Sequence, residues 1–481
     1  MKDVEALLGP DVVQRVVEEG KEWDSPFSMR QEVELTVSEI SSSGDSLSIA
    51  PEPYPPWVVL TPFALPGEKI KARVYYSSRL HSRADLVKVI TPNPEFRDMS
   101  RVQCKYFGEC AGCQYQMLSY DMQLQLKRNV VVKAYKNFSG LDPADVPEIL
   151  PTTGSPLQYG YRTKITPHFE PPRKKREPVE AGSKPDWLKI GFNKMNTKIV
   201  MDIEECPIAT PVLNEALGPV RENIVKNINT YKRGVSLLLR ESLEIPSSDA
   251  AASSTTESLS AAVEKKLCIT DHKATVRERV GDKLFEYTAG SFFQNNNSVL
   301  VPLTSYVRDA IFANDPMPRP THLVDAYCGS GLFAITLSPH FETIAGIELS
   351  TESIKFAKRN AELNNIPSEK CSFLAGDAAN IFSTVQNFPR DKSVLIIDPP
   401  RKGSDEKFID QLIEFGCAAV VYVSCNVHTQ ARDVGMILRK SREKMGGREY
   451  VVESIRGFDL FPQTAHVESV AVLRLVDSKS D

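Results

Sequence analysis

The chain has 481 residues, which is more than one hydrophobic core usually serves, so two or three domains are expected. Its 41% hydrophobic and 25% charged residues and its net charge of -4 are typical of a soluble globular protein and exclude a membrane protein or a disordered tail. No run of about 18 apolar residues occurs, and the acidic N-terminus does not resemble a secretion or transit signal, which predicts a cytoplasmic location, with the nucleus or the mitochondrion as alternatives.

Residues 1–28 are predicted to form a helical extension, and residues 29–92 a small β-barrel. Apolar and polar positions alternate in five segments of this second stretch, with turn signals between them. The segments are MRQEVELTVSEI, SLSIA, WVVLTPF, EKIKARVYYSS and ADLVKVI. Five short strands suit a barrel of the oligonucleotide-binding type, which would bind irregular RNA, although a β-sandwich fragment would show the same pattern.

Two stretches are locally basic in this acidic chain. Residues 61–90 have six cations against two acids, namely Lys69, Lys71, Arg73, Arg79, Arg83 and Lys88 against Glu68 and Asp85. Residues 162–198 have ten Lys or Arg against four acids and include PRKKREP at 172–178. Each stretch could follow a phosphate backbone, and each could instead be a solvated face, with PRKKREP as a loop or a nuclear address.

Residues 93–290 are predicted to form a mixed α and β central domain. It contains a cysteine cluster, the helical segment QMLSYDMQLQLKRNVVVKAYKNFSG, and a predicted hairpin that pairs YRTKITPHFE with WLKIGFNK. Residues 246–262 lack core-forming side chains and are predicted to be a disordered insertion.

Residues 291–481 alternate β and α segments, which predicts a doubly wound, Rossmann-like α/β sheet of seven strands. The ligand site of such a sheet lies beyond the carboxyl ends of its parallel strands. The last two apolar segments, YVVESIRGFDLFPQ and HVESVAVLRLV, have no helical segment between them. They therefore predict an antiparallel closing strand, which is commoner in methyltransferase sheets than in dehydrogenase sheets.

The first strand of this sheet is followed by a glycine turn. Gly329 and Gly331 let the backbone approach a ligand, and Glu348, at the end of the second strand, could bind both ribose hydroxyls of an adenosine cofactor. The same spacing satisfies the G-x-G-x-x-A pattern of nicotinamide enzymes. The turn alone therefore does not separate the two cofactors.

The fourth strand ends in VLIIDPPRKG, which places Asp398 at the rim of the sheet. The two prolines fix the loop and remove amide donors. Asp-Pro-Pro is frequent in methyltransferases that act on bases, and a dinucleotide enzyme has no need of it. The alternative is a capping aspartate in a βα turn.

The fifth strand, AAVVYVSCN, brings Cys425 to the same rim. Carbon 5 of uracil becomes a nucleophile only after a group adds to carbon 6, and a thiolate is suited to that addition. A free thiol has a pKa of about 8.5, so a positive charge such as Arg401 or a sulfonium would have to lower it. A packed thiol is the alternative, and it is the interpretation for Cys268, Cys328, Cys371 and Cys417.

A base must then remove the proton from carbon 5. Glu468 lies among apolar residues that would raise its pKa toward a useful value. His466, two positions earlier, is the alternative base.

The motifs SCN, IDPPRKG, SFFQNN and HVE together resemble the RNA uracil-5 methyltransferase family, and the resemblance covers nearly the whole chain, with an N-terminal barrel like the TRAM domain. It implies a class I enzyme that uses S-adenosylmethionine. It also implies that Cys425 is the nucleophile and Glu468 the proton acceptor. The residues implied to contact the cofactor are Gln294, Tyr327, Glu348 and Asp398. Many bacterial members have asparagine where this chain has Leu332, so a cofactor hydrogen bond from that side chain is not expected.

Cys104, Cys110 and Cys113, spaced C-x5-C-x2-C, and Cys206 before Pro207 resemble the iron–sulfur ligands of some rRNA-modifying members of this family. Structural disulfides are not expected in a reducing compartment. Four thiolates suit a [4Fe-4S] cluster, and zinc satisfies the same count. Unligated thiols are the third alternative.

The resemblance implies that the chain, as a monomer, methylates carbon 5 of a uridine extruded from folded RNA. A likeness to eukaryotic members, suggested by the insertion, favours uridine 54 in the T-loop of tRNA, whereas the cysteine cluster favours rRNA. Two other functions stay open. One is a nicotinamide-dependent oxidoreductase, and the other is an RNA chaperone without catalysis.

Overall fold

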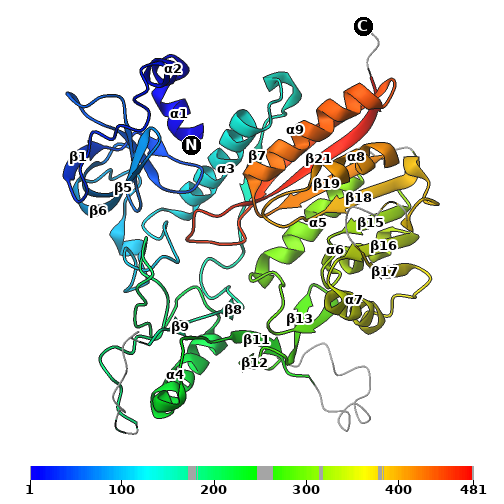
Figure 1. The fold of residues 1–481 in the computed structure, drawn as a ribbon. Helices are drawn as coiled ribbons and strands as arrows, with labels where there is room; N and C mark the ends of the chain where they lie inside the picture. Colours follow the sequence, from blue (N-terminus) through cyan, green and yellow to red (C-terminus); the bar gives the residue numbers. More distant parts are fainter. Residues whose placement is uncertain are drawn as a thin grey trace.

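The computed structural model describes residues 2–171, 180, 182–245, 264–313, 318–376, 382 and 384–478. The predicted insertion 246–262 and the run PRKKREP lie outside the described residues. An N-terminal sheet, a large C-terminal sheet and a central region of short strands make up the molecule (Figure 1). None of the helices among the described residues has the length and apolar character that crossing a membrane requires.

The N-terminal part consists of two helices and a six-stranded sheet. The helices are α1 (Lys2–Leu8) and α2 (Pro10–Glu18). In order across the sheet, the strands are β1 (Glu32–Thr36), β5 (Lys69–Ser78), β6 (His81–Thr91), β4 (Val58–Thr61), β3 (Ser46–Ile49) and β2 (Glu39–Ile40). The prediction of five strands was short by one because the first run changes its partner midway. Val37 N donates to Glu68 O, whereas Ser38 N donates to Leu47 O, which divides the run into β1 and β2.

The basic residues of this sheet are largely paired. Lys71 and Arg73 both contact Glu32 on the neighbouring strand β1, at 2.8 and 2.7 Å. Lys69 pairs with Glu34, and Arg79 pairs with Glu5 of α1. The local excess of positive charge predicted for residues 61–90 is therefore reduced by acids that lie outside that stretch.

The central region holds two long helices and short strand pairs. Its elements are α3 (Tyr120–Phe138), β8 (Lys164–Ile165), β9 (His168–Phe169), α4 (Pro211–Lys226), β10 (Val235–Ser236), β11 (Leu239–Leu243) and β12 (Lys266–Ile269). The predicted hairpin was largely wrong, because β8 pairs with β11 and β9 pairs with β10. Within the described residues a single bridge, His168 to Gly191, joins the two segments. Ile165 instead packs with Leu239 in the local core.

The large C-terminal sheet has eight strands and mixed direction. In order they are β17 (Cys371–Ala375), β16 (Thr343–Glu348), β15 (His322–Ala326), β18 (Ser393–Ile397), β19 (Ala419–Ser424), β21 (Glu468–Asp477), β20 (Arg448–Phe458) and β7 (Leu150–Thr153). The first five are parallel, and β21 runs antiparallel to β19. The α/β class and the antiparallel closing strand are confirmed.

The predicted count of seven strands was wrong by one, because β7 comes from the central region. It pairs in parallel with β20, with Leu150 opposite Arg456 and Thr153 opposite Phe458. Without it, β20 would leave its outer amides unpaired at the edge of the sheet. Four residues, LPTT, carry too little pattern to reveal a partner so far along the chain.

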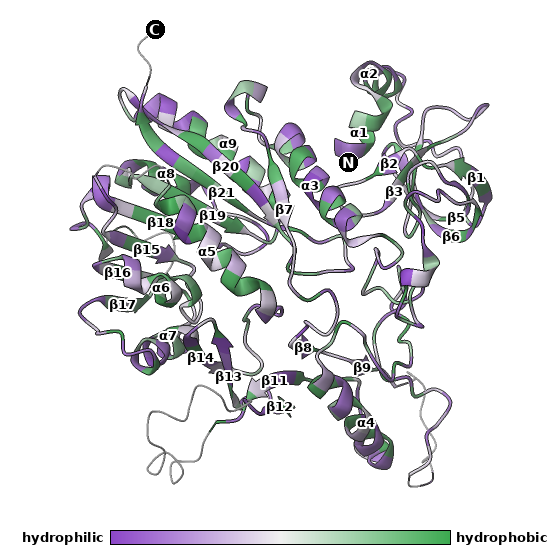
Figure 2. Ribbon diagram, turned by 180° about the vertical axis from the view of Figure 1, so that it is seen from behind, coloured by the Kyte–Doolittle hydropathy of each residue, from purple (hydrophilic) through white to green (hydrophobic). Residues whose placement is uncertain are grey.

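Helices cover both faces of this sheet. They are α5 (Leu300–Ile311), α6 (Leu332–Thr336), α7 (Thr351–Leu363), α8 (Glu406–Phe415) and α9 (Val427–Lys444). The hairpin of β13 (Thr275–Val280) and β14 (Lys283–Thr288) contacts α7, and α3 lies against α9 (Figure 1). Figure 2 shows hydrophobic residues concentrated on β19 and β21, in the middle of the sheet. Two large cores, one on each face, therefore hold the strand ends in place.

Candidate active site

The predicted site residues gather at one edge of the large sheet. Tyr327 follows β15, Asp398 follows β18, and Cys425 follows β19, while Glu348 ends β16. Because these four strands are parallel, their carboxyl ends share an edge. The antiparallel strand β21 begins there with Glu468, and its register pairs Ser424 with Ser469, which brings Glu468 next to Cys425.

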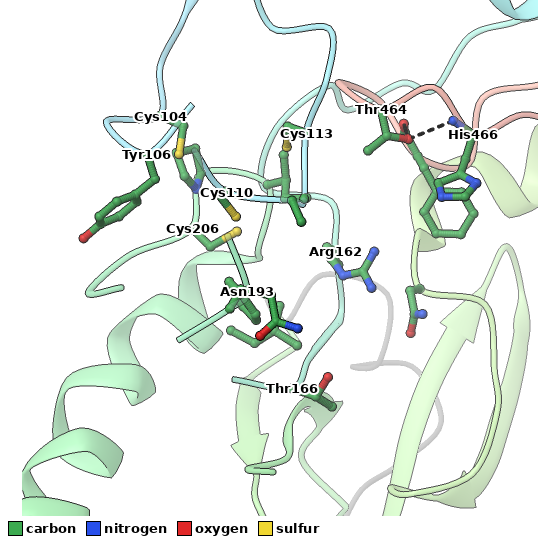
Figure 3. Close-up of a pocket in the computed structure, with 18 of the residues that line it drawn as sticks. Cys104, Tyr106, Cys110, Cys113, Arg162, Thr166, Asn193, Cys206, Thr464 and His466 are labelled. Atoms are coloured by element: carbon green, nitrogen blue, oxygen red, sulfur yellow. Dashed lines mark hydrogen bonds between the residues drawn. The ribbon is translucent and has the colours of Figure 1, made fainter. Parts of the chain in front are cut away.

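A cavity of about 600 Å³ opens at this edge, between the sheet and the central region. Cys425, Glu468, Gln294 and Arg401 line it from the catalytic side. Figure 3 shows the opposite wall, where Arg162 extends from the segment before β8 toward the cavity. Residues far apart in the sequence thus face one cavity.

Cys425 is half-buried and protonated at neutral pH. Burial raises the pKa of its thiol to about 11, and the carboxyl groups of Glu468 and Asp398 reinforce that shift. Arg401 lowers the pKa, as expected, but its effect is smaller than the sum of the others. The direction expected for Arg401 is confirmed, but Arg401 alone does not provide a thiolate.

The carboxyl groups of Glu468 and Asp398 also have raised pKa values. Glu468 is 4% exposed, and burial together with the charge of Asp398 raises its pKa to about 8, against the opposing effect of Arg401. Burial raises the pKa of Asp398 to about 7. Glu468 and Asp398 can therefore both gain and lose a proton near neutral pH.

His466 lies on the cavity wall just before β21, and its backbone N donates to Thr464 Oγ1 (Figure 3). Desolvation lowers the pKa of its imidazole, and the nearby cations Arg401, Lys127 and Arg162 lower it further. His466 is consequently neutral at pH 7. It remains the alternative base to Glu468.

The loop after β18 is tied to the start of α9, so Arg401 stays beside Cys425. Asn426 Nδ2 donates to Arg401 O at 2.8 Å, and Thr429 Oγ1 donates to the same carbonyl at 3.2 Å. The Asn426 side chain also caps α9 by accepting from His428 N. One asparagine, next to the cysteine, therefore joins the ends of the fourth and fifth parallel strands.

The glycine turn after β15 is tied to the end of β16 by hydrogen bonds. Glu348 Oε2 accepts from Gly329 N at 3.2 Å, and Oε1 accepts from Ser350 N at 2.9 Å. Tyr327 has φ 62°, a left-handed conformation that costs energy in a residue with a side chain. Such strain is common where backbone is shaped for a ligand.

Asp325 is a further residue of this turn that sequence reasoning did not assign. Its Oδ2 accepts from Ala334 N at 2.9 Å, while the buried Oδ1 has no hydrogen-bond partner among the described residues. Burial raises the pKa of this carboxyl to about 8. The signal was present in the sequence, because Asp325 opens the glycine motif.

Comparison with known proteins shows which family the chain resembles. A sequence profile described as tRNA (Uracil-5-)-methyltransferase matches residues 248–476. The tRNA (uracil(54)-C(5))-methyltransferase of Schizosaccharomyces pombe is 44% identical over 470 residues, which cover 97% of this chain and 82% of that protein.

The chain belongs to the tRNA uracil-5 methyltransferase family.

Two further comparisons agree with this membership of the tRNA uracil-5 methyltransferase family. The tRNA (uracil(54)-C(5))-methyltransferase of Saccharomyces cerevisiae is 38% identical over 500 residues, covering 96% of this chain and 77% of that protein. A crystal structure of the Pyrococcus abyssi tRNA (uracil-54, C5)-methyltransferase in complex with S-adenosyl-L-homocysteine superposes with a TM-score of 0.60 at 23% identity, covering 92% of this chain and 100% of the other. That likeness supports the fold. The family resemblance read from the four motifs is confirmed.

Gln294 reaches the cavity of this family member from a loop that a buried network supports. Phe293 stacks on Tyr287 with ring centroids 4.5 Å apart. The Tyr287 hydroxyl accepts from Arg240 and donates to Glu278, and Arg240 Nη1 donates to Asn295 Oδ1 at 3.1 Å. The two neighbours of Gln294 in the chain are thus both held from behind.

Phe292 is a second residue that sequence reasoning missed. Its side chain lines the cavity and is 76% exposed, which is rare for a phenylalanine of a folded domain. The motif SFFQNN contains two adjacent phenylalanines, and no feature of the sequence distinguishes the exposed Phe292 from the buried Phe293.

The four predicted metal ligands line the far wall of the same cavity (Figure 3). Burial raises the pKa of Cys113 to about 12 and that of Cys206 to about 11. Nowhere in the described part of the chain do three His, Cys, Asp or Glu side chains form a group that could hold a metal ion. The arrangement therefore does not support the predicted metal centre.

Proposed function

We propose that this protein transfers a methyl group from S-adenosylmethionine to carbon 5 of uridine 54 in the T-loop of tRNA. The observation that carries the proposal is that Cys425 and Glu468 face one cavity from adjacent strand ends. The reaction requires a nucleophile and a later base at the same uracil ring. The two fungal relatives with tRNA uracil-54 activity in their names support the choice of nucleotide.

Cys425 begins the proposed reaction by adding to carbon 6 of uracil. Its thiol is protonated, so the proton must first move to a neighbouring carboxylate. Asp398, whose pKa is about 7, is partly ionised at neutral pH and suits this role. The new bond joins Sγ to carbon 6, and the electrons of the carbon 5–carbon 6 double bond move to form an enolate.

S-adenosylmethionine, when bound, supplies a methyl group on a positively charged sulfur. The residues of the glycine turn fit such a molecule, because Glu348 offers carboxylate oxygens for a ribose and the unpartnered Oδ1 of Asp325 lies buried behind the turn. Tyr327, Gln294 and Asp398 are the other proposed contacts. Leu332 offers no polar group there.

Glu468 completes the reaction by removing the proton from carbon 5. The electrons of that C–H bond restore the double bond, and the Sγ–carbon 6 bond breaks with its electron pair returning to Cys425. Glu468 must be ionised at this moment, and its pKa of about 8 makes it a matched base near neutral pH. His466 is the alternative acceptor.

We further propose a class I methyltransferase sheet preceded by a TRAM-like barrel that contacts RNA. The strand order β17-β16-β15-β18-β19-β21-β20 with one antiparallel member supports the first part, and the six-stranded N-terminal sheet supports the second. We also propose that the protein acts as a monomer. A cytoplasmic location, with the nucleus or the mitochondrion as alternatives, fits a tRNA substrate.

The iron–sulfur or zinc centre stays a prediction, and no step of the mechanism depends on it. The four cysteines share a wall but form no ligand group in this arrangement. Purification without oxygen, followed by measurement of iron, sulfide and zinc per chain, tests the prediction. A metal content near zero that Cys110→Ser does not change would contradict it.

The deciding experiment incubates the protein with labelled S-adenosylmethionine and unmodified tRNA or rRNA transcripts, followed by mapping of the methylated nucleotide. We expect label at uridine 54 of tRNA, and a stable protein–RNA adduct with RNA that contains 5-fluorouridine. Cys425→Ala should abolish both, with Cys417→Ala, a buried strand-end cysteine, as the matched control.

Other outcomes separate the alternatives. Label in rRNA alone would favour the rRNA substrate. Binding of a nicotinamide cofactor in place of S-adenosylmethionine would favour the oxidoreductase. RNA phenotypes that survive in Cys425→Ala would favour a chaperone.

A further inference from the structure

The connection from β20 to β21 carries Glu468 at its end, and we call residues 459–467 the base loop. His466 belongs to it, and Glu468 follows it directly as the first residue of β21. The base loop packs against the N-terminal half of α3 and the segment that precedes it, more than 300 residues earlier in the chain. Its conformation therefore depends on side chains from the central region.

A fully buried ion pair holds the first part of the base loop. Lys127 of α3 and Asp459 are each 0% exposed and contact one another through Nζ and Oδ1. Lys127 Nζ also donates to Phe461 O at 3.0 Å, and Tyr120 OH donates to Asp459 Oδ2 at 3.0 Å. Burying such a pair costs desolvation that its attraction often fails to repay. The pair therefore indicates that one particular conformation of the base loop is required.

A second set of hydrogen bonds holds the middle of the base loop. Gln123 Nε2 donates to Gln463 Oε1 at 3.0 Å, and Gln463 N donates to Gln123 Oε1 at 2.9 Å. The carbonyl of Gln463 accepts from the backbone N of Gln114 and of Tyr115, at 2.9 and 3.0 Å. Gln463 has φ 71°, a left-handed conformation that these bonds maintain.

The supports of Cys425 are different. Its neighbours in the chain are fixed by α9, where Asn426 binds Arg401 O and Gln430 Nε2 donates to Tyr422 O at 2.7 Å. Gln430 Nε2 also donates to Ser469 O at 3.0 Å, so the start of β21 shares this support, but none of these interactions involves Lys127 or Gln123. Disturbing the base loop, which leads directly into Glu468, should therefore move the base more than the nucleophile.

We propose that Lys127 and Gln123 are positioning residues that fix the base loop, and through it the carboxyl group of Glu468, over carbon 5 of the substrate. This inference rests on the proposed function. A displacement of the order of 1 Å from a mutation remote from the chemistry can cost roughly 100-fold in rate. The step affected is proton removal and not thiol addition or methyl transfer.

The test separates these steps with two RNA substrates. RNA with 5-fluorouridine reports addition and methyl transfer, because the adduct cannot lose a proton, whereas uridine RNA reports the full cycle. We expect Lys127→Met to form the fluorouridine adduct at nearly the wild-type rate. With uridine RNA, its turnover should fall roughly 100-fold, and methylated protein–RNA adduct should accumulate. Lys136→Met, an exposed lysine on the same helix, is the matched control and should behave as wild type.

Gln123→Ala is the second variant, because Lys127→Met leaves the Asp459 carboxylate buried without its cation and could prevent folding. It should show the same selective loss to a smaller degree, with thermal unfolding near that of wild type. Equal loss of both activities in the folded variants, or normal turnover of uridine RNA, would overturn the inference. If the wild-type protein forms no fluorouridine adduct, the proposed function fails instead.

Discussion

The proton on Cys425 is the feature that governs the chemistry at the residue scale. Its neighbours Glu468 and Asp398 are carboxyl groups, so burial and charge act in the same direction and raise its pKa to about 11. The bound sulfonium and a proton acceptor must overcome that shift together. A thiol held protonated is also less open to oxidation, because the thiolate is the reactive form.

Substitution of the base should stop the reaction after methyl transfer. Glu468→Gln keeps the size of the side chain but cannot accept the proton from carbon 5. Methylated, covalently bound RNA should therefore accumulate in a denaturing gel with uridine RNA. Normal turnover in this variant would transfer the role to His466, and His466→Ala would then be the variant that accumulates adduct.

In the wild-type protein, the methylated adduct should decay faster as the pH rises. Glu468 removes the proton only when ionised, and its pKa is raised to about 8. In the wild-type protein the decay rate should increase by roughly tenfold per pH unit below pH 8 and level off above it. Rapid mixing followed by a pH jump measures it, and a rate independent of pH between 6 and 8 would contradict the assignment.

The closeness of Cys425 and Glu468 could be predicted from the sequence, but their electrostatics could not. SCN and HVE indicate Cys425 and Glu468, because the chemistry of uracil requires both types of residue. Their pKa values depend on Asp398 and on burial at a junction of three strands. Arg401 was correctly expected to lower the pKa of Cys425, but the opposing neighbours are visible only in space.

At the scale of elements, the network behind Gln294 supports the cofactor side of the cavity. Tyr287→Phe removes the hydroxyl that joins Arg240 to Glu278 and leaves both buried groups short of a partner. We expect a loss of about 1–3 kcal/mol in the free energy of unfolding and weaker binding of S-adenosylmethionine by calorimetry. Tyr306→Phe, which loses one hydrogen bond to Ser454, is the control that should leave cofactor binding intact.

Elements with long periodic patterns were predicted well, and short ones were not. The alternating β and α segments after residue 320 indicate the parallel strands and the antiparallel closing pair. The hairpin of residues 161–170 was largely wrong because two-residue strands such as β8 and β9 can pair with any nearby edge. The eighth strand, β7, escaped prediction because its partner lies in another part of the chain.

For the whole molecule, three buried carboxyl groups should make stability fall as pH rises. The pKa values of Asp325, Asp398 and Glu468 are raised to about 8, 7 and 8, whereas an unfolded chain releases these protons near pH 4. The folded state therefore holds more protons between about pH 4 and pH 8, and each group costs roughly 1.4 kcal/mol of stability per pH unit in that window. Their stabilising effect is complete below pH 4 and lost above pH 8.

Urea unfolding at pH 5.5 and pH 8.5 measures this slope. Asp325→Asn, which cannot ionise, should reduce this dependence of stability on pH by the contribution of one carboxyl group. A slope unchanged in this variant would mean that Asp325 is already ionised in the folded protein.

The division into four parts, with boundaries near residues 28, 92 and 290, stays a proposal. Contacts cross those boundaries in several places. Leu65, in the connection between β4 and β5, shares a hydrophobic cluster with Ala465 of the base loop, and α3 lies against α9. Composition and turn signals mark where the pattern changes along the chain, but they do not show which of the four parts pack into a common hydrophobic core.

The pairing of β7 with β20 also sets the order in which the protein can be completed as it is made. Leu150 leaves the ribosome roughly 300 residues before Arg456, its partner, which at about 5–20 residues per second is a delay of tens of seconds. During that time β7 and the apolar side of α3 have no sheet to join. In the nascent chain, β7 and α3 must therefore stay without their partners until β20 and β21 have been synthesised. A chain truncated near its C-terminus would lack Glu468 and would also leave the central region incompletely folded.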